Sequence, residues 1–226
     1  MIHALHGNLG SGSDWTALGI EDLRAVDLWS WQEQHPGITL TKFGEAFAAE
    51  VEAIDPQPIL LGYSLGGRLA LQAMTARPFL WKAAILVSTH PGLASENERE
   101  ERLETDHRWA SRARVEDWAE FLESWNRQPV LASSMPSAAQ VSLESRREAV
   151  ASAFESWSLG HQVAVKQAFP FPVLMINGEL DEKFSALANR FPGAEMVRVS
   201  NAGHRLPTEQ PGELALVIRD WLAKIG

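Results

Sequence analysis

The sequence predicts an α/β protein in which a mostly parallel sheet is flanked by helices and a helical cap is inserted into the sheet order. Short apolar runs that end in Gly, Asn or Ser alternate with stretches of helical periodicity, which is typical of βαβ units. The strand pattern stops at residue 90 and resumes at "FPFPVLMING". We therefore expect a core formed by residues 1–89 and 168–226 and a helical cap formed by residues 90–167.

The strands and helices of the core are predicted from these two patterns, apolar runs and helical periodicity. Buried strands are expected where four or five apolar residues run together, at Ile2–Leu5, Arg24–Leu28, Pro58–Leu61, Ala83–Val87, Val173–Ile176 and Met196–Val199. Helices are expected where apolar residues recur every three or four positions, at Leu40–Ile54, Gly66–Ala76, Phe184–Arg190 and Glu213–Ile225.

The predicted cap contains charged helical segments and several tryptophans. In "ASENEREERLETDHRWASR", Glu98 and Arg102 stand four residues apart, a spacing that places opposite charges on one solvated helix face. The tryptophans of this region indicate an apolar surface of its own.

Composition excludes several classes of function. The chain has 226 residues, a net charge of −9 and no cysteine. The negative charge provides no field that attracts nucleic acid or an anionic membrane, and the absence of cysteine excludes disulfides and thiolate ligands. No apolar run is long enough to span a membrane, and no signal-type segment follows Met1. We expect a cytoplasmic protein, and its oligomeric state stays open.

Ser64 is the first candidate for chemistry. The pentapeptide "GYSLG", from Gly62 to Gly66, matches the G-x-S-x-G nucleophile elbow and lies between a predicted strand and a predicted helix. Glycines flank such a serine because the turn is sharp and strained. The alternative is that the glycines simply let a strand and a helix pack closely.

Two further residues complete a candidate catalytic triad. A serine hydroxyl needs a histidine to take its proton and a carboxylate to orient that histidine. Asp181 follows one late strand and His204 follows the last strand, which is the order found with nucleophile elbows. Asp181 in a plain turn and a structural His204 are the ordinary alternatives, and Glu179 and Glu182 are weaker candidates for the acid.

An oxyanion hole is expected beside Ser64. Its donors are the backbone N–H of Leu65, at the start of the helix, and the backbone N–H of Asn8, in the loop after the first strand. His3 and His6 point to opposite sides of a strand and form no metal pair. We expect neither a metal nor a cofactor.

The sequence resembles the α/β-hydrolase superfamily and, more closely, the MenH family of 2-succinyl-6-hydroxy-2,4-cyclohexadiene-1-carboxylate synthases. The elbow and histidine loop are common to the superfamily, whereas Arg68 after the elbow, "HPGL", "SWNRQPV" and "GELDEKF" favour the narrower family. The resemblance implies a lyase that eliminates pyruvate from a succinylated cyclohexene carboxylate in menaquinone biosynthesis. It also implies that Ser64 acts as a base and that the partner is a small polycarboxylate.

Further site residues are implied by the same resemblance. Arg68, Arg102 and Arg146 would bind substrate carboxylates, since guanidinium groups bind carboxylates with two hydrogen bonds. Trp125 and Tyr63 would line the pocket. The ordinary alternatives are that Arg102 pairs with Glu98, that Arg146 is solvated beside Arg147 and that Trp125 belongs to the core of the cap.

The chain departs from the family pattern at several positions. It starts at the strand before the oxyanion loop, so the usual N-terminal strands are expected to be missing. Asn8 and Asn126 stand where relatives often carry aromatic residues, and "SWQEQHPG" replaces a Pro-Gly-His-Gly loop. Two other functions stay open. One is a small-acyl carboxylesterase with Ser64 as covalent nucleophile, and the other is a ligand-binding protein without catalysis.

Overall fold

A six-stranded parallel sheet forms the centre of the molecule. The computed structural model describes residues 1–132 and 134–226. The strands stand in the order β2-β1-β3-β4-β5-β6, and each ladder between neighbours is parallel. Their bounds are β1 Ile2–Leu5, β2 Leu23–Val26, β3 Ile59–Tyr63, β4 Ala83–Val87, β5 Val173–Gly178 and β6 Glu195–Val199. All six predicted strands are present, and the observed ends differ from the predicted ends by no more than a few residues.

Both faces of the sheet are buried, which explains why its strands are continuously apolar. On β4, Ala84 and Leu86 belong to one apolar cluster, whereas Ala83, Ile85 and Val87 belong to the other. This alternation follows from the two-residue period of a strand. The sheet therefore separates two hydrophobic cores.

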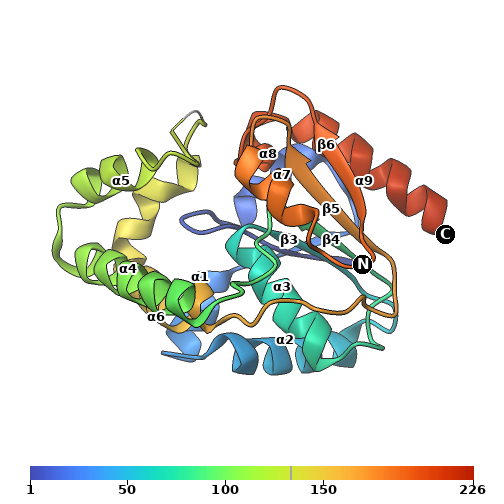
Figure 1. Ribbon diagram of the computed structural model, residues 1–226, viewed down its shortest axis with the longest axis horizontal. Coiled ribbons are helices and arrows are strands. Elements are labelled where there is room, and N and C mark those ends of the chain that lie inside the picture. Colours follow the sequence, from blue (N-terminus) through green and yellow to red (C-terminus); the bar gives the residue numbers. More distant parts are fainter. Residues whose placement is uncertain (133) are drawn as a thin grey trace.

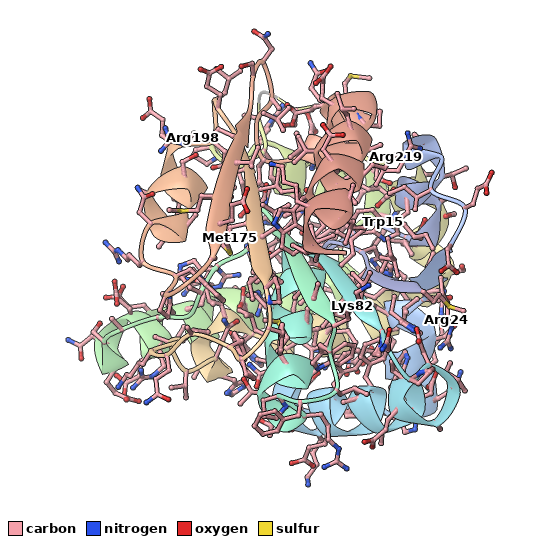
Figure 2. All side chains as sticks on the ribbon, turned by 90° about the vertical axis from the view of Figure 1, so that its right-hand side faces the viewer. Trp15, Arg24, Lys82, Met175, Arg198 and Arg219 are labelled. Atoms are coloured by element: carbon pink, nitrogen blue, oxygen red, sulfur yellow. The ribbon has the colours of Figure 1, made fainter. Side chains whose placement is uncertain are left out.

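Helices cover the two faces of the sheet (Figure 1). On one side lie α1 (Leu28–Gln34), α2 (Leu40–Ile54) and α3 (Leu65–Ala76). The other side carries α9 (Pro211–Ile225) and the 3₁₀ helix η1 (Gly12–Leu18). Figure 2 shows Trp15 of η1 beneath α9, where Arg219 donates hydrogen bonds to the carbonyls of Leu18 and Gly19.

The segment between β4 and β5 forms a separate helical body, on the left in Figure 1. Its elements are α4 (Glu96–Val115), α5 (Trp118–Asn126), η2 (Ala138–Arg146), α6 (Arg147–Ser156) and η3 (Leu159–His161). The two ends of the segment meet, because Leu93 pairs with Val163 and the Val165 N–H donates to the Pro91 carbonyl. This arrangement agrees with an insertion between two adjacent strands.

The first turn of α4 corrects one detail of the sequence analysis. Ser95 and Glu98 form a capping box, so the Glu98 carboxylate accepts hydrogen bonds from Ser95 rather than pairing with Arg102. Arg102 donates instead to the Asp106 carboxylate, at 2.8 Å.

Two short helices, α7 (Glu182–Ala188) and α8 (Leu206–Glu209), follow β5 and β6 near the carboxyl ends of the strands (Figure 1). Across the described residues, no helix is both long enough and apolar enough to cross a membrane. The same residues contain no group of three His, Asp or Glu side chains arranged to hold a metal ion.

Candidate active site

Ser64 lies in a strained turn between β3 and α3. Its φ of 51° and ψ of −107° place a non-glycine residue in a left-handed region that costs about 1–3 kcal/mol. A Cβ on Gly62 would lie 2.6 Å from the Gly66 carbonyl oxygen, and a Cβ on Gly66 would lie 2.1 Å from the Leu5 carbonyl oxygen. Both flanking positions therefore require glycine, and the close packing that they permit holds the serine in its turn.

Ser64, His204 and Asp181 are connected by hydrogen bonds. The distance from Ser64 Oγ to His204 Nε2 is 3.1 Å, and that from His204 Nδ1 to Asp181 Oδ2 is 2.7 Å. His204 and Asp181 are both 5% exposed. A carboxylate only accepts hydrogen bonds, so Nδ1 carries the proton and Nε2 presents its lone pair to the serine.

Local structure fixes both partners of Ser64. Asp181 caps the N-terminus of α7, where its Oδ1 accepts the Phe184 N–H at 3.3 Å and leaves Oδ2 to the histidine. The Phe184 ring packs against the His204 ring with a centroid distance of 4.3 Å. Glu179 and Glu182 are exposed, so the geometry favours Asp181 as the acid.

The predicted oxyanion donors border the same pocket as Ser64. Leu65 is the first residue of α3, where N–H groups have no acceptor within the helix. The loop after β1 packs closely against the start of α3. A Cβ on Gly66 would also lie only 2.5 Å from the His6 carbonyl oxygen. Asn8 and Leu65 both line the pocket, and their role as donors to one oxygen stays a prediction.

The pocket has a volume of about 680 Å³ and lies between the core and the inserted helices. The core contributes Ser64, His204 and Tyr63, while Trp125 reaches it from α5. Burial raises the pKa of Tyr63, which keeps its phenol protonated. Trp125 also packs edge-on against Trp109 and Phe154, so it belongs both to the core of the insertion and to the pocket wall.

Arg68 and Arg102 place positive charge in the pocket wall. Arg68 is 8% exposed, and its Nη1 donates to the Trp157 carbonyl at 2.7 Å. Burial, followed by the neighbouring Arg102, lowers the pKa of Arg68 to about 9, so the group stays charged at pH 7. Among the described residues, no carboxylate lies within 4.0 Å of Arg68, which leaves its charge available to an anionic ligand.

Arg146 lies outside the described wall of the pocket around Ser64. Its Nε and Nη2 donate to Glu33 at 2.7 and 2.6 Å, and its Nη1 donates to Asp27 at 2.8 Å. It borders a separate surface depression next to Trp29 and does not appear in the wall of the described pocket around Ser64. The structure therefore gives Arg146 an ion-pair role between the insertion and α1, and we leave it out of the proposed substrate contacts.

The pocket wall also contains four basic residues that were not singled out from the sequence. They are His90, Lys183, Arg190 and Arg205. His90 and Lys183 stood inside the stretches "HPGL" and "GELDEKF", and Arg205 follows His204 directly, so proximity to a motif was the available signal. Burial, followed by the charge of Arg68, lowers the pKa of His90 to about 3.

Comparisons with known proteins agree with this fold. A sequence profile of the alpha/beta hydrolase family matches residues 4–216. The 2-succinyl-6-hydroxy-2,4-cyclohexadiene-1-carboxylate synthase of Photorhabdus laumondii is 33% identical, covering 89% of this chain and 78% of the relative. The synthase of Pectobacterium atrosepticum is 34% identical, covering 97% of this chain and 92% of the relative.

Solved structures have the same fold. MenH from S. aureus superposes with a TM-score of 0.81 at 23% identity, covering 99% of this chain and 93% of that one. A thermophilic esterase from Thermogutta terrifontis superposes with a TM-score of 0.76 at 22% identity, covering 99% of this chain and 89% of that one. At these identities the superpositions establish the fold alone. The chain belongs to the alpha/beta hydrolase family.

Proposed function

We propose that the protein is a 2-succinyl-6-hydroxy-2,4-cyclohexadiene-1-carboxylate synthase, a lyase that releases pyruvate from a succinylated cyclohexene carboxylate in menaquinone biosynthesis. Relatives that carry this name are 33–34% identical over most of the chain, which supports the proposal. The structural observation that carries it is the Ser64–His204–Asp181 chain of hydrogen bonds, which opens into a pocket walled by Arg68 and Arg102.

The substrate is held by its carboxylates. Arg68 is buried and has no carboxylate partner among the described residues, while Asp106 holds Arg102 in place from the side of α4. A guanidinium binds a carboxylate with two parallel hydrogen bonds, and desolvation in the pocket strengthens this contact. Trp125 and Tyr63 bound the apolar part of the pocket, where the ring of the substrate would lie.

Ser64 acts as the base. His204 Nε2 accepts the hydroxyl proton while the serine oxygen removes a ring proton, and the electron pair of that C–H bond is first delocalised onto a substrate oxygen. The electron pair then forms a new ring double bond as the C–O bond to the enolpyruvyl group breaks. The leaving group departs as an enolate, takes the proton that His204 holds and becomes pyruvate, so no water is consumed. Asp181 stabilises the positive charge on His204 during proton transfer.

Backbone donors stabilise the negative charge that this step creates. Removal of the ring proton places charge on a substrate oxygen, and the N–H groups of Leu65 and Asn8 would bind that oxygen. The start of α3 adds the positive end of its helix dipole. Because these donors are fixed by the backbone, they need no rearrangement during the reaction.

Residues 90–167 form the cap over this site. They contribute Arg102 and Trp125 to the wall, so closure of the cap over a bound substrate would exclude water from the enolate. The two ends of the cap meet at Leu93 and Val163.

The test is product formation by the purified protein. It is supplied with the succinylated cyclohexene carboxylate, and pyruvate is followed by reduction with lactate dehydrogenase. Rapid pyruvate release together with weak turnover of p-nitrophenyl acetate supports a lyase. The reverse pattern, with an acyl group trapped on Ser64, identifies a small-acyl esterase. Substrate binding without any product identifies a binding protein.

A further inference from the structure

Arg205 is a buried cation next to the catalytic histidine. It is 6% exposed and contributes to the wall of the pocket that holds Ser64. Its Nη1 donates to the Ser134 carbonyl at 3.0 Å, and its Nη2 donates to Asn126 Oδ1. These contacts join the loop of His204 to the cap.

The Arg205 guanidinium has five N–H donors, and its two hydrogen bonds within the described residues go to the neutral acceptors Ser134 and Asn126. In the described part of the chain, no carboxylate lies within 4.0 Å of it. Glu209 is close in sequence, but its oxygens accept the backbone N–H groups of Gly203 and Arg205 and the Ser134 hydroxyl. Because no carboxylate in these residues contacts the buried cation directly, the site is suited to an anion that arrives from outside.

Hydrogen bonds hold the Arg205 guanidinium between Asn126 and Ser134. Asn126 is itself oriented by Gln140, since the Asn126 amide donates to Gln140 Oε1 at 2.9 Å. The Asn126 oxygen is thereby turned toward the guanidinium. A purely structural link between Asn126 and Ser134 would be made equally well by a neutral donor, whereas an arginine adds a charge that these two partners do not use.

Arg205 and Arg68 contact different parts of the insertion. Arg68 donates to the Trp157 carbonyl, at the end of α6. Arg205 donates to Asn126, at the end of α5, and to the Ser134 carbonyl. The two guanidinium groups are therefore held by separate segments of the pocket wall. A ligand that uses both must carry two separated anionic groups.

We propose that Arg205 binds a second carboxylate of the substrate, on the side of His204, while Arg68 and Arg102 bind the first. Arg205 thus determines specificity for a substrate with two separated carboxylates and fixes the ring over Ser64. It occupies the role that the family resemblance assigned to Arg146. This inference rests on the proposed function for the identity of the substrate but not for the carboxylate site itself.

The test compares Arg205→Gln, Arg205→Lys and Asn126→Ala with the wild type. Pyruvate release gives KM and kcat, and calorimetric titration with succinate at low salt measures carboxylate binding directly. Arg205→Gln is expected to raise KM and to weaken succinate binding by about tenfold or more, with kcat within a few-fold of wild type. Arg205→Lys keeps the charge but cannot form two parallel hydrogen bonds to a carboxylate. Its KM is therefore expected to lie between those of the wild type and Arg205→Gln.

Two controls separate charge from packing. Asn126→Ala removes one hydrogen-bond partner of Arg205 but keeps the cation, so its KM is expected to rise less than that of Arg205→Gln. Arg198→Gln removes an exposed arginine on β6, in the outer strand seen in Figure 2, and reports any effect of net charge alone. Circular dichroism and Tm confirm that each variant is folded.

The outcomes are distinct. An unchanged KM and unchanged succinate affinity in folded Arg205→Gln overturn the inference, as does an equal loss in Asn126→Ala. If Arg205→Gln does not fold, a larger rise in KM for Arg205→Lys than for Asn126→Ala supports the inference, and equal values overturn it. If the wild type releases no pyruvate, the proposed function fails, and the succinate titrations alone decide on Arg205.

Discussion

His204 Nε2 lies 3.1 Å from Ser64 Oγ, although the two residues are 140 positions apart in the sequence. The parallel sheet explains this contact. Ser64 follows β3 and His204 follows β6, and in a parallel sheet the carboxyl ends of all strands lie along the same edge. The insertion between β4 and β5 then covers that edge with Trp125 and Arg102. In the proposed function, the base thus comes from the core and the carboxylate-binding groups come from both parts.

Replacement of Asp181 tests the orientation of the histidine. Asp181→Asn keeps the size of the side chain but no longer stabilises the charged imidazole, so kcat is expected to fall by about 10²–10⁴-fold with KM nearly unchanged. Steady-state kinetics of pyruvate release measure both constants. Glu182→Gln is the matched control, because Glu182 is the adjacent exposed carboxylate. A larger loss in Glu182→Gln than in Asp181→Asn would reverse the assignment.

The glycines of the elbow give a prediction about stability. A Cβ at Gly66 would meet the carbonyl oxygens of Leu5 and His6 at 2.1 and 2.5 Å. Gly66→Ala is therefore expected to lower the free energy of unfolding by about 1–3 kcal/mol and to reduce kcat, since it displaces the Leu65 N–H. Urea denaturation measures the first effect. Gly212→Ala, in α9 with no atom within 4 Å of its Cβ, should be neutral or slightly stabilising, and equal losses in both variants would contradict the account.

His90 contributes to the pH dependence of stability. Burial lowers its pKa in the folded protein to about 3, against 6.5 for the unfolded chain. Between these values the unfolded state binds more protons, so stability is full above pH 6.5 and is lost as the pH falls through 6.5. This residue alone should account for about 1 kcal/mol of loss between pH 6.5 and 5.5.

The variant His90→Asn isolates that contribution. Its side-chain oxygen can accept the Gly92 N–H, as His90 Nδ1 does at 3.1 Å. Urea denaturation at pH 6.5 and pH 5.5 is expected to give a smaller difference in unfolding free energy for the variant than for the wild type. Equal differences in the two proteins would show that His90 does not titrate in this way.

Steady-state kinetics distinguish the roles of Arg146 and Arg205. Arg146 joins η2 to α1 through partly exposed ion pairs with Asp27 and Glu33, so Arg146→Gln is expected to lower stability by about 0.5–1 kcal/mol in a salt-sensitive manner. Its KM should rise less than that of Arg205→Gln, because it lies outside the described pocket wall. A larger KM for Arg146→Gln than for Arg205→Gln would return Arg146 to the substrate site.

Much of the fold follows from the sequence because its signals are local. Continuous apolar runs predicted the buried strands, and the three- and four-residue spacing in Leu40–Ile54 predicted α2 with its bounds. Ser64, Asp181 and His204 could be predicted as a triad because each stands in a short motif at the end of a predicted strand. The structure connects the three by hydrogen bonds.

Side-chain partners were less predictable, since they depend on contacts between distant segments. Arg146 pairs with Asp27 and Glu33, more than 100 residues earlier, and nothing in its local sequence indicates them. Arg205 stands beside the catalytic histidine, yet its burial becomes evident only when Asn126 and Ser134 are brought against it. Charge alone does not tell a solvated arginine from a buried one.

The most direct test of the central claim is the rate of pyruvate release by Ser64→Ala and wild type, measured with the succinylated cyclohexene carboxylate. The wild type should release one pyruvate per substrate, and the variant, which should fold equally well and bind the substrate, should lose about 10³-fold or more in kcat. Equal pyruvate release by both proteins, or none by the wild type, would contradict the account.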